Sequence, residues 1–117
     1  MEIPSFYPVE EQMAQLRYHW WSVARLIELS KALPVLNIPI DHLYVYYKYE
    51  KLTLRDMVMH IKAVNDADLS YPIILDEDGE LLDGRHRIMK ALLLGVKTIK
   101  AVRFDKNPSP CKIDSAE

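Results

Sequence analysis

The chain has 117 residues, half of them hydrophobic, and a formal net charge of −2. We expect one compact domain with a core of its own, and no second domain. The weak negative charge argues against a dedicated duplex-binding protein, which needs an overall basic field. The single cysteine, Cys111, excludes an internal disulfide and a cysteine metal cluster. With no basic leader and no membrane-length apolar run, the sequence predicts a cytoplasmic protein that does not enter a membrane.

Residues 1–34 are expected to form a helical extension. Apolar residues recur at a helical period between two prolines, so the sequence predicts a helix over residues 9–33. Trp20 and Trp21 would project about 100° apart on this helix. We expect one of them to pack on the domain and the other to cover a pocket or meet a partner. The alternative is that both are half-buried on a broad apolar face.

Next come a short strand and a tyrosine-rich segment. The strand is predicted at residues 36–40, where Pro39 places it at a sheet edge or ends it early. If residues 44–51 are extended, their tyrosines, Tyr47 among them, could wall a base-binding pocket, with Lys48 near phosphates. The alternative is an aromatic connector packed on the core.

A second helix is predicted to begin near Thr53. Thr53 and Asp56 have the spacing of a capping box, and the apolar residues that follow, up to Val64, share one face. His60 lies beside this face, and we expect it to be a packing residue rather than a ligand.

Residues 71–95 are typical of a strand, a tight turn, a strand and a helix with almost no spare residue. The strands are predicted at residues 73–75 and 81–82, on either side of an Asp-Gly turn. Gly84 allows a second sharp turn, because glycine accepts backbone angles that a Cβ forbids. A helix over residues 85–94 follows, closed by a glycine.

The chain is predicted to end with a strand over residues 98–104, followed by a mobile tail or a short appended segment over residues 105–117. The expected fold is therefore one α+β domain. Its core, residues 35–104, would hold a small mixed sheet of about four strands and two helices, with the extra N-terminal helix laid across one side.

The start of the helix after Gly84 collects cations: Arg85, His86 and Arg87. Cations at this end of a helix are unfavourable by roughly 0.3–1 kcal/mol each, so the pattern is suited to holding an anion. Phosphate is the natural candidate, because glycine allows close approach and arginine offers a planar fork. The alternative is that Asp83 caps the helix and leaves the arginines solvated.

Three segments carry a resemblance to a known family. Pro72-Ile-Ile-Leu, Leu82-Asp-Gly-Arg-His-Arg and Gly95-Val-Lys-Thr-Ile-Lys-Ala-Val are similar to the core of the ParB N-terminal domain and sulfiredoxin superfamily. That core runs strand, G-x-x-R, helix, glycine and strand, and the resemblance covers about residues 35–104. It implies that Gly84, His86 and Arg87 contact the phosphates of a nucleotide such as CTP or ATP.

The chain also departs from this family. Sulfiredoxins carry a catalytic cysteine where this chain has Arg85, so we expect no sulfinic acid reductase activity. ParB proteins continue into a DNA-binding and a dimerisation domain, which do not follow here. The superfamily's free serine kinases use a glutamate after the opening strand, and Glu50 lies in the corresponding region.

Three functions fit these observations. The first is a nucleotide-binding domain, with or without the activity of a small NTPase or phosphotransferase, in which Asp83 or Glu50 would act as a base or bind Mg²⁺ and His86 would exchange a proton. The second is a nucleic-acid-binding protein or nuclease that uses the same cations. The third is a non-catalytic interaction module that joins a partner or forms a homodimer through its tryptophans and tyrosines. For the first, we expect Arg87 to bind phosphate and to contribute little to the fold. The alternative is that Arg87 is a structural ion-pair partner of Asp83, and the turn at Gly84 would then be scaffold rather than a binding site.

Overall fold

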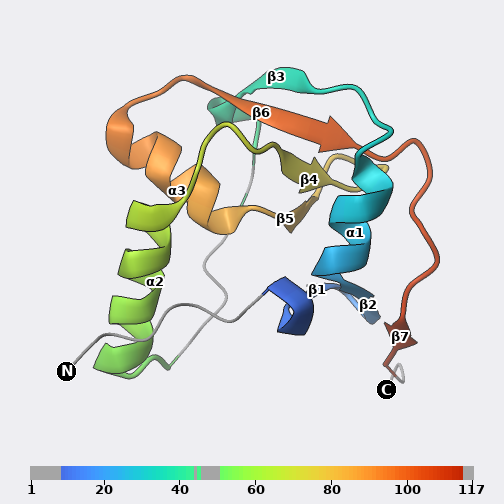
Figure 1. The fold of residues 1–117 in the computed structure, drawn as a ribbon, viewed down its shortest axis with the longest axis horizontal. Coiled ribbons are helices and arrows are strands. Elements are labelled where there is room, and N and C mark those ends of the chain that lie inside the picture. The colour runs from blue at the N-terminus through green and yellow to red at the C-terminus, as the bar shows by residue number, and fades with distance from the viewer. Residues whose placement is uncertain (1–8, 44, 46–50, 115–117) are drawn as a thin grey trace.

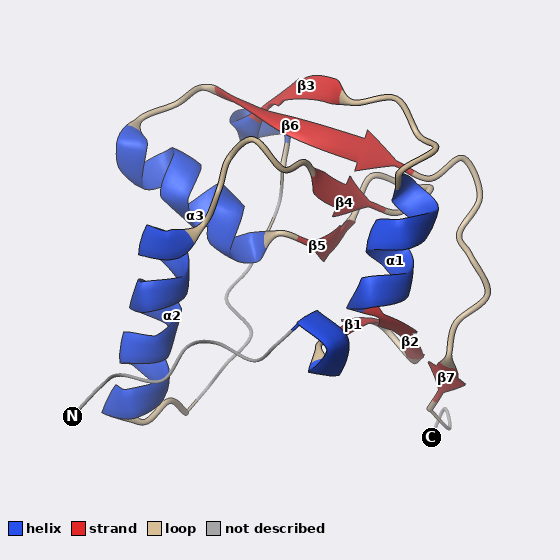
Figure 2. Ribbon diagram, viewed as in Figure 1, coloured by secondary structure: helices blue, strands red, loops and turns tan. Residues whose placement is uncertain are grey.

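A computed structural model describes residues 9–43, 45 and 51–114 of the chain. This part of the chain forms a small α+β fold with three α-helices, a four-stranded sheet and a three-stranded sheet (Figure 1). The larger sheet lies between two groups of elements, with α2 and α3 on one side and α1 and the first two strands on the other (Figure 2). None of the described helices is long and apolar enough to cross a membrane.

The central sheet confirms the predicted mixed sheet of four strands. It consists of β3 (Leu36–Pro39), β4 (Ile73–Leu75), β5 (Leu81–Asp83) and β6 (Thr98–Arg103), in the order β3-β6-β4-β5. β4 runs parallel to β6, while the other two pairings are antiparallel. β3 lies at an edge, as its proline predicts. Every residue of β4 is buried, because β4 is an inner strand with both faces covered.

The two faces of this sheet build two apolar clusters. α3 (Arg85–Leu94) covers one face. The cluster on that face consists of Ile40, Ile73, Leu75, Ile88, Ala91, Ile99 and Ala101. The opposite face packs on the N-terminal strands and on α1, through Ala14, Trp21, Val23, Leu26, Ile74, Leu82, Val102 and Phe104. The alternating residues of β6 therefore divide between the two clusters as the sequence predicts.

The predicted helix over residues 9–33 is wrong. The chain instead forms a short 3-10 helix, η1 (Val9–Glu11), then β1 (Met13–Leu16), β2 (His19–Ser22) and α1 (Val23–Ser30). β1 and β2 pair antiparallel as a hairpin, and Ala14 lies opposite Trp21.

Local features explain why this helix does not form. Arg17 has a φ of 56°, in the left-handed region, and reverses the chain between the two strands. The adjacent aromatic residues Trp20 and Trp21 favour a strand, in which neighbouring side chains point to opposite faces. α1 begins only at Val23, after the N-cap residue Ser22, whose side chain accepts a hydrogen bond from the Arg25 backbone N–H.

Of the two alternatives for residues 105–117, the described residues up to 114 form a short appended segment. β7 (Lys112–Ile113) pairs with β2 as the third strand of the hairpin's sheet. The indole Nε1 of Trp21 donates to the Pro108 carbonyl at 2.8 Å, and that of Trp20 donates to the Asp114 carboxylate at 2.7 Å. The tail is ordered because it supplies acceptors for two indole N–H groups and pairs with the open edge of β2.

The predicted capping box of α2 (Leu54–Asp66) is confirmed. The Thr53 side chain accepts a hydrogen bond from the Asp56 backbone, and the Asp56 carboxylate accepts one from the Thr53 backbone. Only the C-terminal part of the apolar face is buried, at Val64, whereas Leu54 is 83% exposed. The helix therefore contacts the described domain through its second half.

The two adjacent tryptophans provide a test of this fold. Trp21 is 3% exposed, whereas Trp20 lies partly in solvent. We expect Trp21→Ala to lower the free energy of unfolding by about 3–5 kcal/mol, because a large side chain leaves the core. Trp20→Ala is the matched control and should cost clearly less. Urea denaturation measures both, and no loss for Trp21→Ala would contradict the packing of the hairpin on the central sheet.

Candidate functional site

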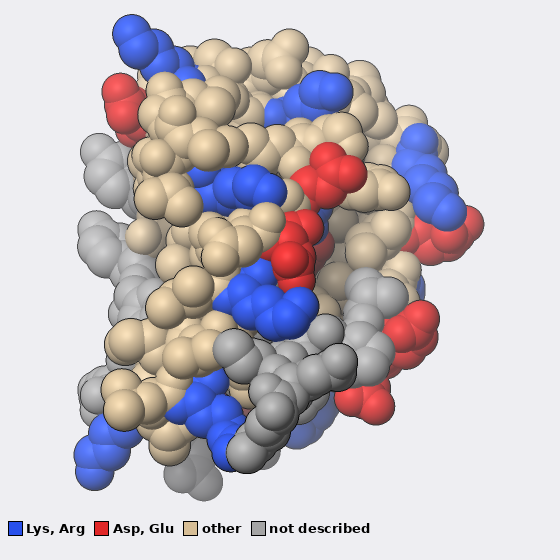
Figure 3. Space-filling model, turned by 60° about the vertical axis from the view of Figure 1, so that its left-hand side comes forward, with Lys and Arg blue, Asp and Glu red and all other residues tan. Residues whose placement is uncertain are grey.

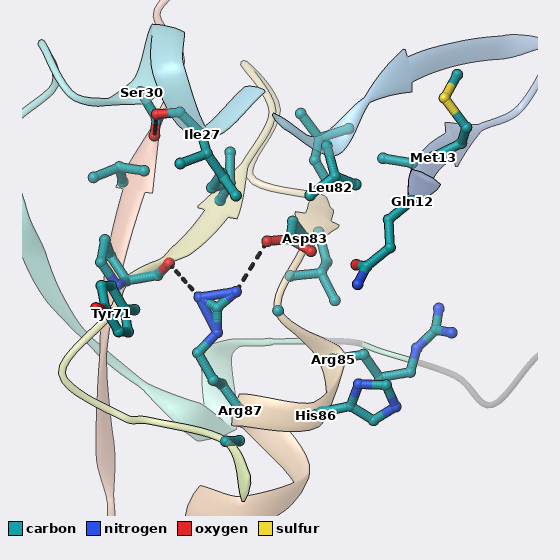
Figure 4. Close-up of a pocket in the computed structure, with 18 of the residues that line it drawn as sticks. Gln12, Met13, Ile27, Ser30, Tyr71, Leu82, Asp83, Arg85, His86 and Arg87 are labelled. Carbon is teal, nitrogen blue, oxygen red and sulfur yellow. Dashed lines mark hydrogen bonds and ion pairs between the residues drawn. The ribbon is translucent and has the colours of Figure 1, made fainter. Parts of the chain in front are cut away.

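A pocket of about 1140 Å³ lies beside the edge strand β5. One wall is apolar and comes from α1, the residues after it and the central sheet, with Ile27, Leu33, Leu82 and Val102 among its residues. The other wall is polar and comes from the start of α3, from α2 and from the segment before β1 (Figure 4). Its polar residues are Gln12, His60, Asp83, Arg85, His86 and Arg87.

Gly84 forms the turn that leads from β5 into α3. Its φ is 118°, and a Cβ at this position would lie 2.5 Å from Cγ2 of Ile73. The fold therefore requires glycine here, both for its backbone angle and for its close contact with β4. Gly84 is also the N-cap of α3, and no side chain caps this helix. The alternative in which Asp83 caps the helix is therefore wrong.

Asp83 instead pairs with Arg87. The Arg87 guanidinium donates to the Asp83 carboxylate at 2.9 Å and to the Pro72 carbonyl at 2.9 Å. The side chain of Arg87 is only 19% exposed, and that of Asp83 is only 16% exposed. These contacts tie α3 to β5 and to the residue before β4, so Arg87 has a structural role. They argue against the expectation that Arg87 is free to bind phosphate and contributes little to the fold.

Arg85 has a different environment. It forms none of the ion pairs found in the described part of the chain. Its Nε is buried and has no hydrogen-bond partner. A buried donor without a partner costs about 1–3 kcal/mol, so this nitrogen is a natural contact for a bound acceptor. Figure 4 shows Arg85 beside His86 and Gln12 along the polar wall.

A histidine pair joins α2 to α3. Nδ1 of His60 lies 2.8 Å from Nε2 of His86, so one ring donates a hydrogen bond to the other. Burial, His60 and the nearby Arg85 and Arg87 lower the pKa of His86 to about 4. Burial and Arg85 also lower the pKa of His60, and Asp56 partly opposes this shift. Both rings are therefore neutral at neutral pH.

His60 is the site residue that the sequence did not predict. We expected a packing residue, and the structure places its ring in the pocket wall against His86. The two histidines are 26 residues apart on separate helices. No local pattern connects them, so only the packing of α2 on α3 reveals the pair.

Three predicted site residues, Tyr47, Lys48 and Glu50, lie outside the described residues. Among the residues that are described, no group of three or more histidine, cysteine, aspartate or glutamate side chains could hold a metal ion. Asp83, the candidate Mg²⁺ ligand, is bound to Arg87. Mg²⁺ binding by Asp83 would therefore require this carboxylate to give up its partner Arg87.

Comparison of the chain with models of protein families finds no match, and comparisons with curated proteins and with solved structures find none either. The resemblance to the ParB and sulfiredoxin superfamily therefore stays a prediction based on three segments. The pocket itself combines an apolar wall with a cationic turn.

The pairing of Arg87 predicts a stability effect. Arg87→Ala should lower the free energy of unfolding by about 1.5–3 kcal/mol, because the mostly buried Asp83 carboxylate loses its partner. Arg85→Ala is the matched control from the same helix turn, and it should leave stability level or raise it slightly by removing a cation from the helix start. Urea denaturation without ligand compares the two. Equal stability of Arg87→Ala and the unmodified chain would mean that the ion pair is not structural.

Proposed function

We propose that this chain binds a phosphorylated small molecule, such as the nucleoside triphosphate CTP or ATP, in the pocket beside Arg85. The observation that carries the proposal is the buried Nε of Arg85, which has no hydrogen-bond partner at the edge of a large pocket. Phosphate oxygens accept charged hydrogen bonds from arginine, and the fork of the guanidinium matches their geometry.

The start of α3 supports the same ligand. The first hydrogen bond into this helix runs from the Ile88 N–H to the Gly84 carbonyl, so the three preceding N–H groups have no partner within the helix. Together with the helix dipole they favour an anion. Gly84 has no side chain in front of them.

The apolar wall supports a ligand larger than phosphate alone. The pocket volume of about 1140 Å³ is slightly above the usual range of small-molecule sites, which is about 300–1,000 Å³. A base or another flat apolar group could lie against Ile27 and Leu33 while its phosphates reach Arg85. A ParB-like nucleotide site in a cytoplasmic protein is our interpretation of this combination.

Binding fits the contacts better than catalysis does. The candidate base Asp83 is held by Arg87, and the pKa of His86 is about 4. A group with so low a pKa is a weak base at neutral pH, because the best general base has a pKa near the working pH. An NTPase or phosphotransferase activity would therefore need a base other than these two residues.

A role in binding or cutting nucleic acid receives less support. On the face drawn in Figure 3, arginine and lysine side chains lie beside aspartate and glutamate side chains and form no continuous basic surface. The net charge of −2 agrees with this mixed distribution. A duplex-binding site usually follows the phosphates with clustered cations.

An interaction module is the second candidate function. The observation in its favour is the exposed apolar face of α2, where Leu54 is 83% and Ile61 is 53% exposed. Such residues, when contiguous, are typical of surfaces that meet a partner or a second copy of the chain. A molecular mass that rises with protein concentration would support this candidate.

A nucleotide panel tests the proposed function. CTP, ATP or GTP at 100 times its dissociation constant should add about 2.7 kcal/mol to stability, and thermal unfolding measures this gain. Arg85→Gln should weaken binding by about ten- to a hundredfold, because a charged hydrogen bond to phosphate is lost. Arg55→Gln is the matched control, since Arg55 is exposed on α2 and does not line the pocket. No stabilisation by any member of the panel, or equal binding by the Arg85→Gln variant, would overturn the proposal.

A further inference from the structure

We propose that the His60–His86 pair completes the anion site by taking up one proton when a doubly charged anion binds. The preferred ligand would then end in a dianionic phosphate, as a phosphate monoester does, rather than in a singly charged phosphodiester. This inference rests on the proposed function, because it assumes that Arg85 binds the anion.

The geometry of the pair allows a proton to be added without breaking it. The two ring nitrogens, 2.8 Å apart, already share one hydrogen bond. Each ring has a second nitrogen that does not face the other ring. In the neutral pair, the second nitrogen of the ring that donates the hydrogen bond carries a lone pair, and the second nitrogen of the ring that accepts it carries a proton. One further proton on the donor ring gives an imidazolium that still donates to the neutral partner. The pair then carries one positive charge next to Arg85.

The charges around the pair explain why a dianion would bring the proton. On α3, Arg85 has no described ion pair, whereas the charge of Arg87 is balanced by Asp83 of β5. On α2, the Asp56 carboxylate acts on His60 and caps its own helix. The other charged residues that line the pocket are Lys31 and Asp68.

Among the described residues, Arg85 therefore supplies the cation without an ion pair beside the two histidines. A singly charged anion is balanced by Arg85 alone, but a dianion leaves one negative charge in a partly buried site. That charge stabilises a protonated histidine pair. In the absence of an anion, burial and the two arginines oppose protonation and keep the pKa of His86 low.

The direction of the pH dependence follows from this linkage. Binding of a dianion raises the pKa of the pair above its value in the free protein. At a pH between these two pKa values, the bound protein therefore holds more protons than the free protein. Affinity for a dianion should therefore increase as the pH falls through this window. A pKa that rises by one unit on binding corresponds to about tenfold tighter binding at low pH than at high pH.

Sulfate is the probe for this test, because it remains a dianion where a phosphate monoester would itself titrate. NMR of the histidine rings, between about pH 3 and 8, measures the pKa of His60 and of His86 with and without sulfate. Methyl sulfate has a similar shape and one charge, so it serves as the matched ligand. His42 is exposed and does not line the pocket, and it is the internal control.

We expect sulfate to raise the pKa of His86 or His60 by at least about one unit, methyl sulfate to raise it much less, and His42 to stay unchanged. If sulfate shifts the backbone amide signals at the start of α3 without moving either pKa, the anion site stands and the proton uptake is wrong. An equal shift by methyl sulfate overturns the preference for a dianion. If no α3 amide responds at any pH, the proposed anion site itself fails.

A variant gives an independent readout. His60→Asn keeps a polar group on α2 but cannot carry the added proton with His86. Its affinity for sulfate at about pH 4 should fall by up to tenfold, towards the value at about pH 8. His42→Asn should keep the pH dependence of the unmodified chain. A His60→Asn variant that folds and keeps the full pH dependence would overturn the role of the pair.

Discussion

The architecture of the site depends on the ion pair between Asp83 and Arg87. This pair joins the end of β5 to the first turn of α3, and the Pro72 carbonyl adds a third point of attachment beside β4. Separating Asp83 from Arg87 would leave a mostly buried charge without its partner, which costs free energy. The ion pair therefore holds β5, α3 and the residue before β4 in one arrangement. Gly84 makes this arrangement possible, because any Cβ at this position would collide with Ile73.

This constraint determines which cation faces a ligand. Because Arg87 is held by Asp83, Arg85 is the arginine of this turn that keeps a buried donor without a partner. The packing of α2 on α3 then brings His60 to the same place, next to His86. The polar wall of the pocket is thus assembled from the start of α3, from α2 and from the segment before β1, opposite an apolar wall built by α1, the residues after it and the central sheet.

The part of the fold that the sequence predicted well is encoded by local signals. The stretch from β4 to α3 follows from apolar runs, two turn glycines and a closing glycine, and α2 follows from the capping box at Thr53. The N-terminal region could not be predicted in this way. Its apolar spacing combines a strand alternation in the hairpin with the helical period of α1, and together these imitate one long helix. The order of the tail depends on indole donors about 90 residues away.

The sequence analysis pointed to the turn at Gly84, but it did not predict the contacts that the residues of this turn make. The turn at Gly84 is visible in the sequence, and the spacing of four residues between Asp83 and Arg87 was a readable sign of an ion pair. The sequence could not show that the same pair leaves Arg85 without a partner, since this depends on burial. The contact between His60 and His86 depends on tertiary packing alone.

A crystal structure of the chain with bound nucleoside triphosphate tests the central claim most directly. The account predicts phosphate oxygens within hydrogen-bond distance of Arg85 and of the first N–H groups of α3, with the pair of Asp83 and Arg87 intact. Phosphates bound by Arg87 after it has left Asp83, or a nucleotide bound away from α3, would contradict the account.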